Sequence, residues 1–188
     1  MIPIPDMPAA RLFVALVPPA TVQAELAEIA APLAGVRWTP AENIHLTMRF
    51  IGDTEEAKAE RYAESLARVR VEPFILPVGG VGLFPTRGAA KVLWAGVGNG
   101  HTRLYQLRKQ VDEALLAVDA GLAMPGFHPH FTVGRIGEQY DSKELAHFLE
   151  RHDELEAPPF RVEQFQLMAS ELKPGRAPEY SVIRNFAL

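Results

Sequence analysis

Residues 43–52 read NIHLTMRFIG, and residues 128–137 read HPHFTVGRIG. Both stretches contain the pattern His-apolar-Thr-apolar, which begins at His45 and at His130, and both continue into Ile-Gly. The same offset of 85 residues relates every matched position. A repeat at fixed spacing indicates that two copies of one folding unit make up the chain.

The repeated motif places a histidine and a threonine on one face of each of two strands. In an extended strand alternate side chains share a face, so His45 lies beside Thr47, and His130 lies beside Thr132. Histidine titrates near neutral pH, so one ring can accept a proton while the other donates one, as phosphodiester cleavage requires. Threonine hydroxyls can donate hydrogen bonds to the non-bridging phosphate oxygens. The pattern therefore predicts phosphate chemistry that needs no metal ion.

The elements around the two motifs also recur in the same order, as strand, helix, motif strand, helix and closing strand. Helices are expected at 21–33, 55–69, 102–118 and 142–151. Strands are expected at 11–17, at the His45 motif, from 73, at 91–97, at the His130 motif, from 159 and at 181–188. This order predicts an α+β fold, with residues 1–188 forming a single domain of two pseudo-symmetric lobes, about 1–87 and 88–188. Facing lobes would bring the two histidine strands together across a cleft. The final strand could be exchanged between the lobes.

Composition narrows the class of protein. The chain has 188 residues, 48% hydrophobic and 22% charged, a net charge of -4 and no cysteine. The acidic balance argues against coating of long nucleic acid and leaves a short or terminal phosphate open. The lack of cysteine excludes disulfides, thiolate metal sites and cysteine nucleophiles. The apolar run at 12–17 is too short to span a membrane and no signal peptide is apparent, so a cytoplasmic protein without membrane attachment is expected.

Arginines near the motifs are weaker candidates than the histidines and threonines. Strict alternation places Arg49 on the His45 face and Phe50 on the opposite face. Arg135 follows His130 by five residues and falls on the opposite face of a regular strand, but a bend at Gly134 would turn it back. Arg135 is therefore a candidate phosphate ligand, weighed against an ion-paired arginine at a strand end.

The chain resembles the 2H phosphoesterases, and specifically the bacterial RNA 2′,3′-cyclic phosphodiesterases once called 2′-5′ RNA ligases, whose signature is two His-x-Thr-x motifs. The similarity spans essentially the full length and is carried by residues 11–16, 43–52, 84–94, 129–135 and 170–180. The resemblance implies a duplicated two-lobe 2H phosphoesterase fold, in which two antiparallel-rich sheets face a central cleft and helices lie outside.

The resemblance also implies hydrolysis of a terminal RNA 2′,3′-cyclic phosphate to a 2′-phosphate. His45 would be the proton donor and His130 the proton acceptor, while Thr47, Thr132 and Arg135 would bind the substrate. No cofactor or metal is implied. The expected partner is an RNA with a cyclic phosphate end, with tRNA fragments among the candidates, and the expected state is a monomer. The same residues would also support ligation of RNA ends through a 2′-5′ bond.

Other functions stay open at this point. One alternative is a phosphodiesterase for another cyclic phosphate or for 2′-5′ oligonucleotides, and another is a non-catalytic protein that binds RNA ends. A metal site built on the two histidines lacks nearby acidic residues or cysteines at ligand spacing. Four aromatic residues are expected either to pack in the core or to stack on a terminal base: Trp38, Phe84, Trp94 and Tyr180.

Overall fold

The computed structural model describes residues 10–98, 101–123, 125–171 and 178–188. These residues form, in chain order, β1 (Ala10–Leu16), α1 (Ala20–Glu28), β2 (Val36–Trp38), the 3-10 helix η1 (Ala41–Asn43), β3 (Leu46–Thr54), α2 (Glu56–Leu66), β4 (Phe74–Phe84), β5 (Val92–Val97), α3 (Thr102–Leu116), β6 (His130–Ile136), α4 (Ser142–His152), β7 (Glu156–Val162), β8 (Gln164–Glu171) and β9 (Glu179–Ala187). The expected helices are all present, and each begins within one residue of its expected start.

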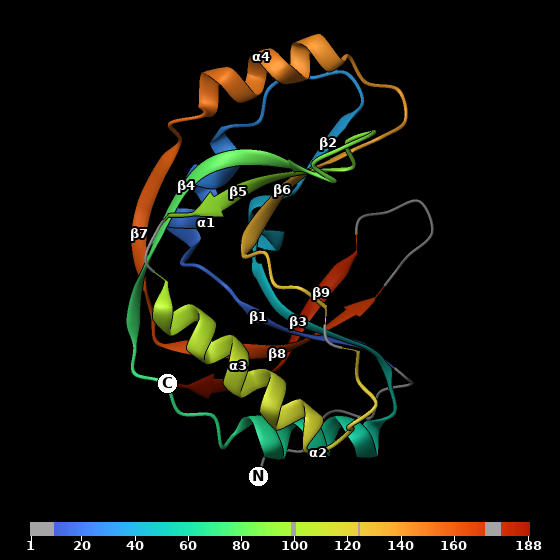
Figure 1. Cartoon of the computed structure of the whole chain (residues 1–188), viewed down its shortest axis with the longest axis vertical. Helices are drawn as coiled ribbons and strands as arrows, with labels where there is room; N and C mark the ends of the chain where they lie inside the picture. Colours follow the sequence, from blue (N-terminus) through green and yellow to red (C-terminus); the bar gives the residue numbers. More distant parts are fainter. Residues whose placement is uncertain (1–9, 99–100, 124, 172–177) are drawn as a thin grey trace.

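The strands form a curled antiparallel sheet made of two halves (Figure 1). Its order is β7-β4-β5-β6-β3-β1-β8-β9. The short strand β2 pairs with the end of β6 that extends beyond the contact with β3. At the centre, β3 and β6 pair at Leu46 and Phe131. The two motif strands are therefore neighbours, as the duplication predicted, and the α+β fold with helices outside is confirmed.

The order of the strands in the sheet differs from their order in the chain. One lobe combines β1 and β3 with β8 and β9, and the other combines β5, β6 and β7 with β2 and β4. The strands on each side of the contact between β3 and β6 thus come from both halves of the sequence.

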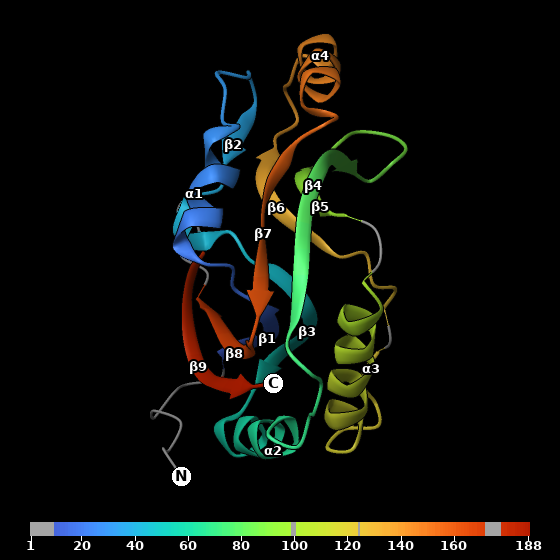
Figure 2. The ribbon, with the colours of Figure 1, turned by 90° about the vertical axis from the view of Figure 1, so that its left-hand side faces the viewer.

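Helices cover the two lobes at opposite ends of the molecule. The α2 and α3 helices pack together on the lobe of β3, while α1 contacts β7 and α4 contacts β4. Figure 2 shows α1 and α3 on opposite sides of the strands. The buried face of α3 explains its position, because Leu104, Leu107, Val111 and Leu115 recur at helical spacing and are fully buried.

One buried hydrophobic cluster runs through both lobes, from Leu12 in β1 to Phe160 in β7 and Phe186 in β9. The lobes consequently share a core that fixes how the two motif strands meet. Within the described ranges, no helix is long and apolar enough to cross a membrane.

Candidate active site

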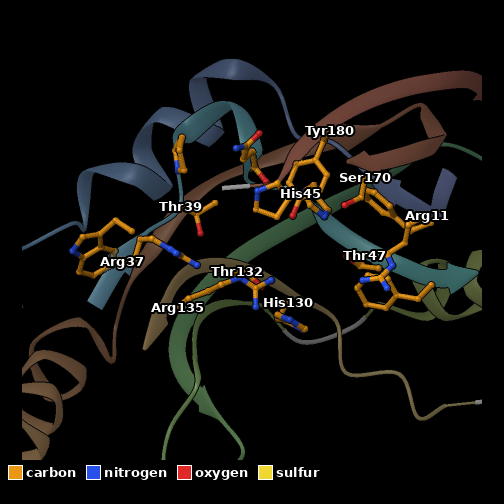
Figure 3. Close-up of a pocket in the computed structure, with 16 residues that line it drawn as sticks. Arg11, Arg37, Thr39, His45, Thr47, His130, Thr132, Arg135, Ser170 and Tyr180 are labelled. Atoms are coloured by element: carbon orange, nitrogen blue, oxygen red, sulfur yellow. Dashed lines mark hydrogen bonds between the residues drawn. The ribbon is translucent and has the colours of Figure 1, made fainter. Parts of the chain in front are cut away.

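Both repeated motifs open into one cleft between the lobes (Figure 3). His45, Thr47, His130 and Thr132 all line it, and its volume is about 430 Å³. Volumes of roughly 300–1,000 Å³ are usual for sites that hold small ligands. The structure therefore brings together the four side chains that the repeat singled out.

The two histidine rings are held in the same way. His45 Nδ1 lies 2.8 Å from the carbonyl oxygen of Asn43, and His130 Nδ1 lies 2.6 Å from the carbonyl oxygen of His128. A carbonyl oxygen accepts hydrogen bonds and cannot donate one, so each Nδ1 carries the hydrogen. Each Nε2 is then the nitrogen that is available to exchange a proton. In both copies the acceptor lies two residues before the histidine, so the repeat includes the group that fixes the tautomer.

The pKa values of both histidines lie below the ordinary value for the side chain. Burial is the main cause for His45, the Asn43 carbonyl opposes it, and the charges of His130 and Arg135 lower the pKa further. Burial also lowers the pKa of His130, with opposition from the His128 carbonyl and a further lowering by the His128 ring. Because the positive charge of His130 lowers the pKa of His45, the state in which both rings are protonated is disfavoured.

A β-bulge follows the threonine in each motif strand. In β3, Thr47 pairs with Ala15 and Arg49 pairs with Val14, which leaves Met48 as the extra residue. In β6, Thr132 pairs with Trp94 and Gly134 pairs with Leu93, which leaves Val133 as the extra residue. Met48 and Val133 are related by the same 85-residue offset as the histidines. An extra residue reverses the alternation of side chains beyond it.

The bulges decide which later side chains reach the cleft. Arg135 lines the cleft with His130, so the expectation of a bend near Gly134 is confirmed, with Val133 as the inserted residue. The expectation for β3 was wrong: Arg49 is buried and Phe50 lines the cleft instead. Strict alternation failed there because the sequence gives no local sign of the bulge at Met48.

A buried ion-pair cluster supports the bulge in β3. Arg49 Nη1 lies 3.2 Å from Asp112 Oδ1, and Arg108 Nε donates to Asp112 Oδ2 at 2.7 Å. Arg108 Nη1 also donates to the carbonyl oxygen of Met48 at 2.5 Å. The α3 helix thus binds the bulged backbone between Thr47 and Arg49 directly. In β6, the backbone N–H of Thr39 donates to the equivalent carbonyl of Val133 at 2.9 Å.

The cleft is also lined by residues outside the two motifs, and only some of these were candidates from the sequence. Trp38 and Tyr180 line the cleft, whereas Phe84 and Trp94 pack near the His130 ring, with centroids 4.9 Å and 6.5 Å from it. Residues 172–177 of the expected C-terminal loop lie outside the described residues, but both ends of that loop reach the cleft. The lining residues to which the sequence assigned no role are Arg11, Phe13, Arg37, Thr39, Pro40, Asn43, Phe50, Ser170 and Pro178.

The charge of the cleft is opposite to that of the chain. The chain carries a net charge of -4, yet the lining residues include Arg11, Arg37 and Arg135, and no described aspartate or glutamate lines the cleft. Arg11 lies 3.6 Å from the carboxylate of Asp53. No group of three or more His, Asp or Glu side chains in the described ranges is arranged to hold a metal ion. Two histidines, two hydroxyls and guanidinium groups form a site suited to a phosphate anion.

Comparisons with known proteins agree with this chemistry. The model of a family described as LigT-like phosphoesterase matches residues 16–94 and 97–178. A Thermus thermophilus protein named RNA 2′,3′-cyclic phosphodiesterase is 35% identical, covering 95% of this chain and 90% of its own length. An Archaeoglobus fulgidus protein of the same name is 32% identical, covering 94% and 99%. A solved structure of a Thermus thermophilus protein superposes with a TM-score of 0.78 at 28% identity, covering 95% and 97% of the two chains.

Proposed function

Because this chain belongs to the LigT-like phosphoesterase family, we propose that it hydrolyses RNA 2′,3′-cyclic phosphate ends to 2′-phosphates. The observation that supports this most directly is the pair of histidines, each with Nδ1 bound to a carbonyl and Nε2 available in one cleft. The relatives that bear the name RNA 2′,3′-cyclic phosphodiesterase supply the substrate class.

In the proposed reaction, neutral His130 accepts a proton at Nε2 from water as the water oxygen attacks phosphorus. The bond between phosphorus and O3′ breaks, and protonated His45 donates its Nε2 proton to O3′. The product keeps the phosphate on O2′ and regains a 3′-hydroxyl. Thr47 and Thr132 donate hydrogen bonds to the non-bridging oxygens, and Arg135 offsets their negative charge.

The surroundings of the two rings support this division of roles. The departing O3′ belongs to the ribose, so the nucleoside must lie on the side of the proton donor. The His45 ring contacts Phe13 and Tyr180, with centroids at 5.1 Å and 5.0 Å, and all three residues line the cleft. An aromatic wall beside His45 suits a nucleoside, because bases stack on aromatic side chains. A 5′-hydroxyl in place of water would give the 2′-5′ ligation product.

Product analysis tests the proposal. A short RNA with a 2′,3′-cyclic phosphate is incubated with chelator and wild-type protein, His45→Ala or His130→Ala, and products are assigned by ³¹P NMR. Wild type should form the 2′-phosphate, and each variant should be slower by on the order of 100-fold or more. An intact ring in the wild-type reaction would sink the proposal and favour a different phosphate ester or a binding role. A 3′-phosphate product would contradict the assigned scissile bond.

A further inference from the structure

Arg37 faces the cleft next to Arg135, although neither the motifs nor the proposed reaction uses it. Arg37 in β2 is the direct antiparallel partner of Arg135 in β6. Both side chains line the cleft that holds the two histidines. Figure 3 shows Arg37 and Arg135 on the same side of the cleft, with Arg135 nearer Thr132 and His130.

Two guanidinium groups in this position repel one another. Side chains directly opposite in an antiparallel pair have Cβ atoms about 5 Å apart, and like charges there destabilise the pair. Neither guanidinium group forms an ion pair or hydrogen bond with any residue that the structure describes, and no described carboxylate lines the cleft. Both side chains are exposed, so water screens part of this repulsion, and a bound anion would offset the rest.

The reacting phosphate accounts for Arg135 but leaves Arg37 without a partner. The phosphate must lie between the Nε2 atoms of His45 and His130, and Arg135 is the cation that reaches toward them along β6. Arg37 lies on β2, the strand that pairs directly with β6, and neighbouring strands are about 4.8 Å apart. A second anion, displaced from the first by a comparable distance, would engage Arg37.

We propose that Arg37 binds the phosphodiester on the 5′ side of the terminal nucleoside, so that the enzyme selects oligonucleotide ends over cyclic mononucleotides. This inference rests on the proposed function, because it assigns a second phosphate of the same substrate. A 2′,3′-cyclic mononucleotide without a 5′-phosphate carries a single anionic group, whereas any RNA end of two or more nucleotides carries at least two. Guanidinium recognition of phosphate is strong, since charge and hydrogen bonds act together.

Three substrates separate the charge of the second phosphate from its bulk. The first is a diadenosine RNA with a terminal 2′,3′-cyclic phosphate, the second is the same compound with an uncharged methylphosphonate between the nucleosides, and the third is adenosine 2′,3′-cyclic phosphate. Values of kcat/KM are measured for wild type, Arg37→Gln and Arg61→Gln. Arg61 is an exposed arginine on α2 outside the cleft, so its variant controls for loss of one positive charge.

Wild type and Arg61→Gln should favour the charged dinucleotide over both other substrates by about tenfold or more, the effect of one hydrogen bond to an ionised group. Arg37→Gln should lose that preference, because its kcat/KM should fall about tenfold more for the charged dinucleotide than for the mononucleotide. Equal losses on all three substrates would overturn the inference and assign Arg37 to the reacting phosphate. Lack of preference in wild type would also overturn it. Turnover of none of the substrates by wild type would reject the proposed function together with the inference.

Discussion

Arg135 in β6 and Phe50 in β3 occupy equivalent positions, 85 residues apart, and both face the cleft. Each follows its motif threonine by three residues, and a bulge one residue after the threonine turns each toward the histidines. The duplication therefore includes the bulge after each threonine, but the side chain three residues after the threonine differs between the copies. One side of the cleft therefore carries a cation and the other an aromatic ring.

Removal of the Arg135 guanidinium should weaken catalysis and change its pH dependence. Arg135→Gln is expected to lower kcat/KM by about 10- to 100-fold, since a charged hydrogen bond to phosphate is lost. The positive charge of Arg135 lowers the pKa of His45, so the variant should also show a higher pKa for the proton donor. Steady-state rates across pH measure both effects. A lower rate with no movement of the alkaline limb would argue that Arg135 does not act on His45.

The wild-type dependence of kcat/KM on pH should be bell-shaped with its maximum on the acidic side. Activity rises as His130 loses its proton, and it falls as His45 loses its proton. Both pKa values are lowered from 6.5, so the alkaline limb should begin below about pH 6.5. The two limbs belong to the coupled pair as well as to the single rings. A plateau that extends beyond pH 8 would contradict the lowered pKa of the proton donor.

Phe50 should act as a stacking surface for the base. Its side chain is 68% exposed although it is large and apolar, and its ring lies 6.2 Å from that of Phe13. Phe50→Ala is expected to raise KM for RNA ends by about 5- to 100-fold, since stacking on an aromatic side chain contributes roughly 1–3 kcal/mol per base. The value of kcat should change little. Phe50→Trp keeps an aromatic ring, so its KM should stay close to the wild-type value.

Ile75 on β4 supplies the matched control for Phe50. It is 57% exposed and lies outside the cleft, so Ile75→Ala removes a comparable apolar surface without touching the site. Equal KM values for the Phe50 and Ile75 variants would show that the ring at residue 50 has no part in binding.

Asp112 should be essential for stability because two buried arginines share its carboxylate. Asp112→Asn leaves Arg49 and Arg108 without that charge, and loss of one partner from a buried cluster costs about 3–5 kcal/mol in free energy of unfolding. Urea unfolding measures the change. Glu113→Gln is the matched control, because Glu113 is exposed and its Lys109 partner is 3.8 Å away, so a change within about 0.5 kcal/mol is expected. Similar losses in both variants would refute a special role for the buried cluster.

The sequence predicted the parts of the fold and site that follow from periodicity and repetition. Spacing predicted the four helices and the motif strands. The 85-residue offset predicted that His45 and His130 would line one cleft. The bulge at Met48 was not predictable in this way, because the carbonyl it exposes is satisfied by Arg108, 60 residues away. Arg37 was missed for the same reason, since its position depends on the pairing of β2 with β6. The 85-residue offset could have predicted the position of Phe50, because it relates Phe50 to the candidate Arg135.

The most direct test of the two-histidine account compares the pH dependence of kcat/KM for wild type, His45→Ala and His130→Ala on an RNA 2′,3′-cyclic phosphate. Both variants should keep the wild-type fold by circular dichroism. The account predicts that the residual activity of His45→Ala lacks the alkaline limb and that of His130→Ala lacks the acidic limb. Loss of the opposite limbs would reverse the roles of donor and acceptor. Wild-type profiles at near wild-type rates in both variants would contradict acid and base catalysis by this pair.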